Sequence, residues 1–321
     1  ELQGLKFENW EALQCKPSLE VYYLTTMYAA EFILGFLGNT VVICGYIFCV
    51  RDWKSFNVYL FSLAVSDLAF LCTLPSLVIN YSQGIKVTDT DFCLSNRYLL
   101  HVNLYSSILF HTWISIDRYL ILKHPLRQHI LLKRNTAVFV SLCIWVFVTL
   151  QLLPLLTFID MGLDDNNQTH CKDYASSGDA SNSLIYSLFL TVSGYMLPMA
   201  FLCCFYYKIA RFLKARNGVF ENSSFQRPLK LITITGIMFF VLYTPYHIMR
   251  NVRISSRRHY QGDADCTLII INCLYIISRP IAFSHSVINP LFYFLMGDHF
   301  RETLLGKAVR SYFSVFTFAT C

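Results

Sequence analysis

The sequence predicts an all-α membrane protein: a seven-transmembrane helix bundle followed by a short amphipathic eighth helix. Of its 321 residues, 55% are hydrophobic and 14% are charged, whereas a typical soluble domain carries about 25% charged residues. The apolar residues are concentrated in seven runs, each at or above the ~20 residues that a helix needs to cross the hydrocarbon core of a bilayer. We attribute the net charge of +6 to membrane topology and expect no nucleic acid as a partner.

The seven apolar runs define the predicted spans. Their approximate ranges are 21–50, 57–82, 93–122, 134–158, 182–210, 229–255 and 267–295. After them, a stretch beginning at Asp298 separates apolar from basic residues on two sides, which is typical of a helix lying on a membrane surface. Because no repeat or linker divides the chain, we expect one transmembrane domain between two shorter parts: an N-terminal segment (1–20), the domain (21–297), and helix 8 with a tail (298–321).

Lysine and arginine are unevenly distributed among the segments between the spans. They are frequent after the first, third and fifth spans and in the tail, whereas the segment after the fourth span is acidic. By the positive-inside rule, this pattern predicts an extracellular N-terminus and a cytoplasmic C-terminus in a multi-pass protein of the plasma membrane. The sequon at Asn167 then lies on the extracellular side, where glycosylation takes place.

Four cysteines fall on the predicted extracellular side: Cys15, Cys93, Cys171 and Cys266. An even number of cysteines in an oxidising compartment predicts two disulfides, and the sequence leaves all three possible pairings open. The chain shows no C-x-x-C spacing of the kind that holds a structural metal.

Ionisable residues inside apolar spans are candidate functional residues, because a charge within the membrane is costly. One of them is acidic, Asp67, in the middle of the second span. The others are cationic and lie towards the extracellular ends of the third, sixth and seventh spans: Arg97, His101, His247, Arg250, Arg253 and Arg279. Their positions on three different helices raise the question of what holds them there.

Two interpretations of these cationic residues compete. A single arginine at the end of a span can extend its guanidinium group to the lipid headgroups. Arginines from three helices at a similar depth repel one another in a low dielectric, which favours a binding site for an anion. Arginine, more than lysine, suits planar bidentate recognition of a carboxylate or phosphate.

Neighbouring polar residues can support such a site. Tyr28 and Tyr246 can donate their hydroxyls to an anion or fill space, and for Tyr105 we expect space filling. Asp173 either pairs with one of the arginines when the site is empty or lies in solvent. We find no Ser-His-Asp or Cys-His arrangement and no glycine-rich phosphate loop, so we expect a binding protein and not an enzyme.

Each of the seven spans contains a characteristic residue or short motif, and these follow one another in a fixed order. They are Gly38-Asn39, Asp67 in LAVSD, Cys93 with Asp117-Arg118-Tyr119, Trp145, Pro198 with Tyr206, Phe239 with Pro245, and Asn289-Pro290-Leu291-Phe292-Tyr293. In this order and spacing, the whole chain resembles the rhodopsin-like (class A) G-protein-coupled receptors. The resemblance therefore implies a receptor.

The resemblance also implies roles for particular residues. The G-protein switch would comprise Asp117, Arg118, Tyr119, Tyr206, Asn289, Pro290 and Tyr293. A polar centre would comprise Asp67, Asn39, Ser107 and Asn289, with an allosteric sodium ion at Asp67 and Ser107. The disulfides would join Cys93 to Cys171 and Cys15 to Cys266.

Four segments, SNRYLLHVNLYSSILF, YTPYHIMRNVRISSR, CKDYASSGD and SRPIAF, resemble members of the family that sense small dicarboxylates. The likeness implies succinate as the ligand, bound by Arg97, His101, Arg250 and Arg279, with support from Tyr28 and Arg253. It implies a heterotrimeric G protein of the inhibitory class as a partner, beside arrestin and membrane lipids. The alternatives are 2-oxoglutarate or a nucleotide as the ligand and, from a different class, a dicarboxylate transporter.

Three residues depart from the family pattern. His285 stands where an asparagine is usual beside the sodium centre, His111 replaces an apolar residue, and Tyr243 replaces the usual tryptophan of the sixth span. The two histidines are expected to affect sodium binding and the low activity of the receptor in the absence of a ligand. We therefore expect higher basal signalling than in close relatives.

Overall fold

The computed structural model describes residues 18–48, 50–83, 88–124, 129–159, 161–163, 169–171, 173–215, 223–259 and 266–296. The elements within these ranges, in chain order, are η1 (Leu19–Leu24), α2 (Thr25–Phe48), α3 (Ser55–Leu71), α4 (Leu74–Ser82), α5 (Thr90–Lys123), η2 (Ile130–Leu132), α6 (Arg134–Leu152), α7 (Leu155–Phe158), β1 (Met161–Leu163), β2 (Thr169–Cys171), η3 (Tyr174–Ser176), α8 (Ala180–Thr191), η4 (Val192–Met196), α9 (Leu197–Ala215), α10 (Ser223–Met238), η6 (Phe239–Tyr243), α11 (Thr244–His259), α12 (Cys266–Phe283) and α13 (His285–Met296). The predicted helix after Asp298, Cys15 and the sequon at Asn167 lie outside the described residues.

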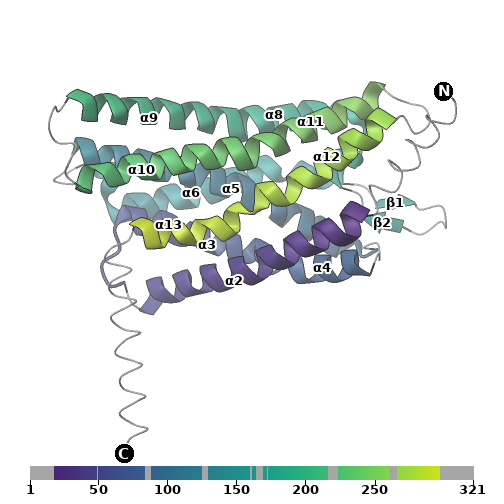
Figure 1. The fold of residues 1–321 in the computed structure, drawn as a ribbon, viewed down its shortest axis with the longest axis horizontal. Helices are drawn as coiled ribbons and strands as arrows, with labels where there is room; N and C mark the ends of the chain where they lie inside the picture. The colour runs from purple at the N-terminus through teal and green to yellow at the C-terminus, as the bar shows by residue number, and fades with distance from the viewer. Residues whose placement is uncertain are drawn as a thin grey trace, which may run out of the picture.

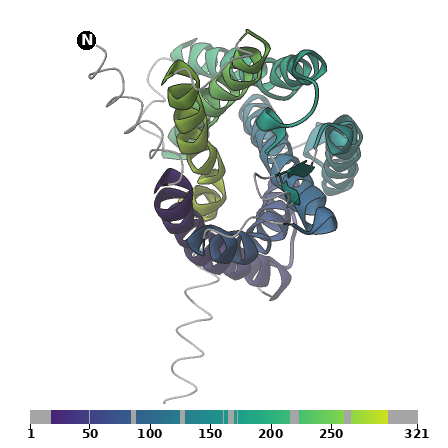
Figure 2. The ribbon, with the colours of Figure 1, turned by 90° about the vertical axis from the view of Figure 1, so that its right-hand side faces the viewer.

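The helices run alongside one another as an elongated bundle (Figure 1), and the view along the bundle shows them arranged in a ring (Figure 2). Within the described residues, six stretches are long and apolar enough to cross a membrane: Leu19–Phe48, Ser55–Ser82, Arg134–Phe158, Ala180–Phe212, Leu231–Arg258 and Cys266–Leu291. The remaining predicted span, 93–122, is the 34-residue helix α5. All seven predicted spans are therefore helical.

Helix α5 is less apolar than the other spans because polar residues lie along its buried surface. Arg97, Asn103, His111 and Asp117 are each at most 7% exposed. Their burial against other helices explains why this helix falls outside the six most apolar stretches although it is the longest helix described. The polar groups of α5 face protein and not lipid, as expected for ionisable residues in a membrane.

Prolines account for most irregularities of the predicted spans. The π-helical turns η4 and η6 end just before Pro198 and Pro245, and Pro75 lies in the first turn of α4, where the second span is interrupted. Proline lacks a backbone N–H and clashes with the preceding turn, so the helix must widen or break at that point. The last span is also divided, into α12 and α13, at Ser284.

A small β-hairpin departs from the all-α prediction at one end of the bundle. Its two three-residue strands, β1 and β2, pair antiparallel, with Met161 opposite Cys171. We call this the hairpin end, and it is the right-hand end in Figure 1. A disulfide joins Cys171 at the end of β2 to Cys93 in the first turn of α5, which confirms one of the two predicted disulfides.

The chain after β2 is also fixed to the sixth span. Arg257 on α11 donates hydrogen bonds to the carbonyl oxygens of Ala175, Ser177 and Gly178, at 3.2, 2.9 and 2.8 Å. Gly178 has a φ of +66°, a conformation that suits glycine. The segment between β2 and α8 is therefore held both by the disulfide and by the last turn of α11.

Two glycines allow close contacts between spans. A Cβ atom at Gly38 would lie 2.8 Å from Pro290 Cγ, and one at Gly194 would overlap ring atoms of Tyr105. The Gly194 contact brings η4 against α5 directly beneath the cationic residues of the hairpin end.

We expect Gly194→Ala to destabilise the bundle, because the added methyl group overlaps a buried ring that cannot move freely. Overpacking of this kind typically costs about 1–3 kcal/mol. A thermal unfolding experiment on the purified protein should show a lower Tm. The matched control is Gly236→Ala, whose Cβ would lie an ordinary 3.4 Å from Leu202 Cδ2. Equal melting temperatures for the two variants would contradict the assigned contact.

Candidate functional site

The structure brings the predicted cationic residues of three spans together near the hairpin end. Arg97 and His101 come from α5, Arg250 from α11 and Arg279 from α12, and all four are at most 7% exposed. None of them extends into lipid, so the headgroup interpretation does not apply to these four. What they share is burial; they differ in what compensates their charge.

Asp173 is the counter-ion of two of these residues. Its carboxylate lies between two guanidinium groups, with Oδ1 3.3 Å from Arg97 Nη1 and Oδ2 3.1 Å from Arg279 Nη1. Asp173 therefore bridges α5 and α12, and the interpretation that it pairs with the arginines is confirmed. The carboxylate retains limited contact with solvent, since its side chain is 18% exposed.

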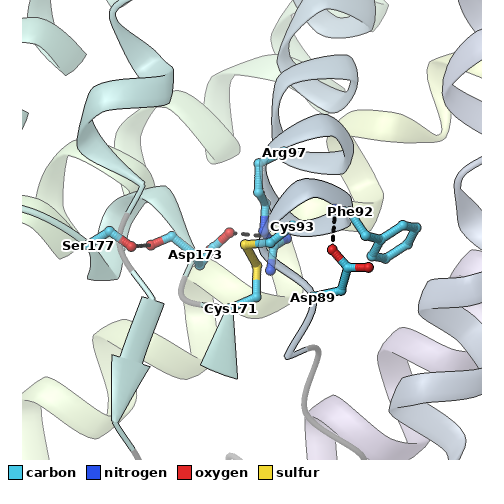
Figure 3. Close-up of a disulfide and its surroundings, with 7 residues drawn as sticks. All are labelled: Asp89, Phe92, Cys93, Arg97, Cys171, Asp173 and Ser177. Atoms are coloured by element: carbon cyan, nitrogen blue, oxygen red, sulfur yellow. Dashed lines mark hydrogen bonds and ion pairs between the residues drawn. A yellow bond between two sulfur atoms is a disulfide. The ribbon is translucent and has the colours of Figure 1, made fainter. Parts of the chain in front are cut away.

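Local geometry places Asp173 at this position. Cys93 and Arg97 lie one turn apart on α5, and Cys171 and Asp173 lie two residues apart after β2. The Cys93–Cys171 disulfide therefore sets the segment that carries Asp173 beside Arg97, as Figure 3 shows. The Ser177 hydroxyl donates to the backbone carbonyl of Asp173 at 2.9 Å and fixes the turn that follows.

The electrostatic surroundings keep Asp173 ionised. Burial alone would raise the pKa of its carboxyl group, but the positive charges of Arg279 and Arg97 outweigh burial and lower the pKa below its ordinary value. A hydrogen bond from the Tyr275 hydroxyl acts in the same direction. Asp173 is thus a carboxylate throughout the physiological pH range.

Arg250 is compensated in a different way. It is fully buried, and its guanidinium group donates to Tyr105 Oη at 2.7 Å and to oxygens of Ser187 and Thr191 on α8. All of these acceptors are neutral. The Tyr105 hydroxyl is therefore a hydrogen-bond partner, and our expectation that it only fills space was wrong.

The two histidines near the arginines have different environments. His101 Nδ1 donates to the carbonyl of Arg97 at 2.7 Å, so its Nε2 is the atom that faces the Tyr246 hydroxyl at 3.3 Å. His247 stacks on Tyr195 with ring centroids 4.6 Å apart, and neither of its ring nitrogens has a hydrogen-bond partner among the described residues.

The predicted supporting residues lie at the margin of the cluster. Tyr28 on α2 is 1% exposed and close enough to Arg279 and Arg97 to interact with their charges. Arg253 on α11 is half-buried, and its Nε has no hydrogen-bond partner among the described residues. Tyr28 therefore belongs to the cluster, whereas Arg253 lies at its edge.

The charges of the cluster do not cancel among the described residues. Of the three guanidinium groups, those of Arg97 and Arg279 pair with the Asp173 carboxylate, and that of Arg250 has neutral acceptors, so these four side chains hold three positive charges and one negative charge. The positive charges outnumber the negative one by two. A buried excess of this size favours binding of a dianion, because unpaired charges in a low dielectric are unfavourable.

A separate polar centre surrounds Asp67, deeper in the bundle. Asp67 Oδ1 accepts from Asn103 Nδ2 at 2.9 Å and from Ser286 Oγ at 3.0 Å, and Oδ2 accepts from Asn289 Nδ2 at 2.7 Å. Asn289 Oδ1 in turn accepts from His111 Nε2 at 3.0 Å. The predicted grouping of Asp67 with Asn289 is confirmed, and His111 joins it through the asparagine.

A sodium ion at this centre would compete with protein donors. A hard cation needs inward-facing oxygen lone pairs, and three of those of the Asp67 carboxylate already accept from Asn103, Ser286 and Asn289. His285 Nδ1 donates to the Ala282 carbonyl at 2.7 Å, which leaves Nε2 directed towards Asp67 Oδ1 at 3.8 Å. In this neighbourhood, the side-chain oxygens of Ser107, Asn39 and Tyr243 have no hydrogen-bond partner among the described residues.

The predicted switch lies at the opposite end of the bundle. Arg118 Nη2 pairs with Asp117 Oδ2 at 2.8 Å, and the Arg118 guanidinium group lies 3.8 Å from the centre of the Phe56 ring. Asp117 also accepts a hydrogen bond from Ser55. Arg118 is thereby held against the start of α3.

The remaining residues of the predicted switch are more scattered. The Tyr119 ring lies 5.4 Å from that of Phe205, and Tyr206 on α9 is 42% exposed. Pro290 packs against Gly38, and Tyr293 belongs to α13. The described contacts do not join Tyr206 to Arg118, so its part in the switch stays a prediction.

The second predicted disulfide also stays a prediction. Cys266, the first residue of α12, is half-buried and is not joined to another cysteine that the structure describes. Its predicted partner, Cys15, lies outside the described residues.

Sequence reasoning overlooked several residues of both sites. Ser187, Thr191 and Tyr275 escaped notice because hydroxyl groups are common in membrane helices and carry no distinctive signal. Glu31 had a signal: it is an acidic residue inside the first span, and it is 3% exposed with neither carboxylate oxygen hydrogen-bonded among the described residues.

Comparison with known proteins gives a consistent result. The family described as "7 transmembrane receptor (rhodopsin family)" matches residues 38–293. Succinate receptor 1 of Rattus norvegicus is 51% identical over 316 residues, covering 98% of both chains. The protein of the same name from Mus musculus is 48% identical over 316 residues, again covering 98% of both chains. A purinoceptor of Homo sapiens is 34% identical over 301 residues, covering 92% of this chain and 79% of the purinoceptor.

We expect Asp173→Asn to lower thermal stability by about 3 kcal/mol, because it leaves two buried guanidinium groups without a counter-ion. The folded-state pKa is lowered, so this contribution is complete above the unfolded value of about 3.9 and is lost only as the pH falls through the folded value. The decrease in Tm should therefore be the same at about pH 6 and about pH 8.

Asp179→Asn is the matched control for this experiment. Asp179 caps α8 by accepting from Asn182 N at 2.9 Å, and asparagine caps a helix equally well. A pH-dependent difference, or a Tm loss as large for the control, would contradict the ionic bridge.

Proposed function

Because the chain belongs to the rhodopsin family of seven-transmembrane receptors, we propose that it is a receptor for a small dicarboxylate and that this ligand is succinate. It is a multi-pass protein of the plasma membrane and a receptor, not an enzyme. Its partners are a small-molecule ligand and a heterotrimeric G protein. The identity of the ligand and the residues that bind it form the proposal.

The observation that carries the proposal is the Asp173 carboxylate between Arg97 and Arg279. This bridge provides one pole that is already complementary to a carboxylate. One carboxylate of the ligand shares the two guanidinium groups with Asp173. Bidentate pairing of arginine with carboxylate supplies both strength and geometry.

The second pole is Arg250 together with His101. No described anion balances the charge of Arg250, because its described hydrogen-bond acceptors are all neutral. Its neighbour His101 is linked to the same helix, α11, through the Tyr246 hydroxyl. A short dicarboxylate spans the two poles, and its two negative charges match the excess of two guanidinium groups. Tyr28 and Arg253 support the ligand from the margin.

The similar proteins support succinate in particular. Two relatives that align along 98% of their length carry the name succinate receptor 1, whereas the purinoceptor is more distant at 34% identity. A nucleotide would need a surface for stacking its base, and 2-oxoglutarate differs from succinate by one chain carbon. Both remain alternatives that a ligand panel separates.

Ligand binding at the hairpin end is proposed to act on the opposite end of the bundle. With the hairpin end extracellular, Arg118 lies on the cytoplasmic side, where release from Asp117 and Phe56 allows it to engage the G protein. We propose the inhibitory class of G protein and arrestin as partners, in keeping with the family resemblance.

For the polar centre, we propose that protein groups and not a sodium ion satisfy Asp67. The three hydrogen-bond donors to its carboxylate support this assignment. The hydrogen bond from His111 to Asn289 connects the centre to α5. Basal signalling above that of close relatives remains our expectation for this arrangement.

We expect succinate to activate the wild type in a G-protein assay and Arg279→Ala to lose at least about tenfold in potency, since each lost charge-assisted pair is worth about 1.5–3 kcal/mol. The panel consists of succinate, maleate, 2-oxoglutarate and ADP, with surface expression measured in parallel. Arg258→Ala is the control, because Arg258 is exposed at the end of the same α11 that carries Arg250.

Each alternative has a distinct outcome in this panel. An unaltered succinate response in Arg279→Ala would remove this residue from the site. A stronger response to ADP or 2-oxoglutarate than to succinate would identify that compound as the ligand in place of succinate. Accumulation of labelled succinate in cells without a G-protein response would establish a transporter in place of a receptor.

We expect the wild type to bind succinate equally in sodium chloride and choline chloride, because three protein donors already bond to the Asp67 carboxylate. His285→Asn replaces the imidazole with an amide oxygen, a better cation ligand, and should make succinate affinity sodium-dependent by several fold. Equilibrium binding of labelled succinate to membranes measures both. His129→Asn, remote from the centre, is the control. Strong sodium dependence of the wild type would contradict the assignment.

A further inference from the structure

Arg250 is held by a closed hydrogen-bond network between α8 and α11. Its Nε donates to Ser187 Oγ at 3.0 Å, and its Nη2 donates to the Ser187 carbonyl at 3.2 Å and to Thr191 Oγ1 at 3.0 Å. Ser187 and Thr191 lie one turn apart on α8, and Arg250 is 0% exposed. The guanidinium group is thus attached along one face of the neighbouring span.

The network orients the two hydroxyl groups as acceptors towards Arg250. Ser187 Oγ uses its hydrogen to donate to Asn251 Oδ1 at 2.6 Å, and Thr191 Oγ1 uses its hydrogen to donate to the Ser187 carbonyl at 2.8 Å. A hydroxyl has one hydrogen, so both oxygens must present lone pairs to the arginine. Asn251 Nδ2 also donates to Thr191 Oγ1, at 2.9 Å, which closes the network.

The hydrogen-bond network satisfies the N–H donors of Arg250, but it does not balance the positive charge of the guanidinium group. Arg97 and Arg279 are paired with a carboxylate, whereas the described acceptors of Arg250 are all neutral: two hydroxyls and one carbonyl of α8 and the hydroxyls of Tyr105 and Tyr246. A free arginine side chain samples many rotamers, and the planar fork of bonds removes that freedom. A cation fixed in this way sits at one defined distance from the Asp173 pole.

We infer that Ser187 and Thr191 are positioning residues that aim the Arg250 guanidinium group and thereby set which length of dicarboxylate spans the two cationic poles. The inference rests on the proposed function, because it assigns Arg250 to the second pole. Neither hydroxyl needs to touch the ligand. Their effect is on selectivity: a loosened Arg250 accommodates longer and shorter diacids, and succinate loses its advantage.

The test compares Thr191→Val with Thr191→Ser in the full-length receptor. Valine keeps the shape of the side chain and removes the acceptor, whereas serine restores the acceptor. Potency is measured in the G-protein assay for malonate, succinate and glutarate, together with surface expression. We expect Thr191→Val to lower the potency of succinate about tenfold and to bring the potencies of succinate and glutarate closer together. Thr191→Ser should restore both the potency of succinate and its advantage over glutarate.

Controls separate positioning from folding and from failure of the proposed function. Thr112→Val removes a buried hydroxyl that bonds only to the carbonyl of Ile108 in its own helix, and it should leave the ratio unchanged. If Thr191→Val does not reach the surface, Ser187→Ala, which removes the acceptor of Nε, serves the same test. An unresponsive wild type would refute the proposed function; a responsive wild type with an unchanged ratio in both variants would refute the positioning role.

Discussion

The ionic bridge between Asp173 and the guanidinium groups of Arg97 and Arg279 is the interaction on which the hairpin end of the bundle depends. Two buried cations from different helices repel one another, and the desolvation of each costs several kcal/mol unless a counter-ion is present. One carboxylate, kept ionised by the same two charges, makes this juxtaposition possible.

The position of that loop follows from three attachments. The disulfide fixes Cys171 to the start of α5, Arg257 binds the carbonyls that follow, and Ser177 closes the turn after Asp173. The first two attachments reach different helices, α5 and α11, and the third closes the loop on itself, so the carboxylate has little freedom. The site is therefore organised before any ligand arrives, which reduces the entropy lost on binding.

Three arginines of one cluster are thus stabilised by two different physical means. Arg97 and Arg279 share one carboxylate, and Arg250 is held by neutral acceptors, hydroxyl groups and a carbonyl. The first arrangement gives a pole with a bound counter-ion, and the second gives a pole with no counter-ion of its own. The polar centre at Asp67 shows the reverse case, a buried anion satisfied by neutral amide and hydroxyl donors and approached by His285.

The sequence by itself determined the seven spans, the depth of the cationic residues and the helix that carries each of them, because hydropathy, proline positions and helical spacing are local properties. It also indicated Cys93–Cys171 through family resemblance. Only the tertiary structure decided that Asp173 bridges Arg97 and Arg279, that Tyr105 accepts from Arg250, and that α8 supplies the remaining acceptors. These pairings depend on the rotation and relative depth of neighbouring helices, which hydroxyl groups scattered through apolar runs do not reveal.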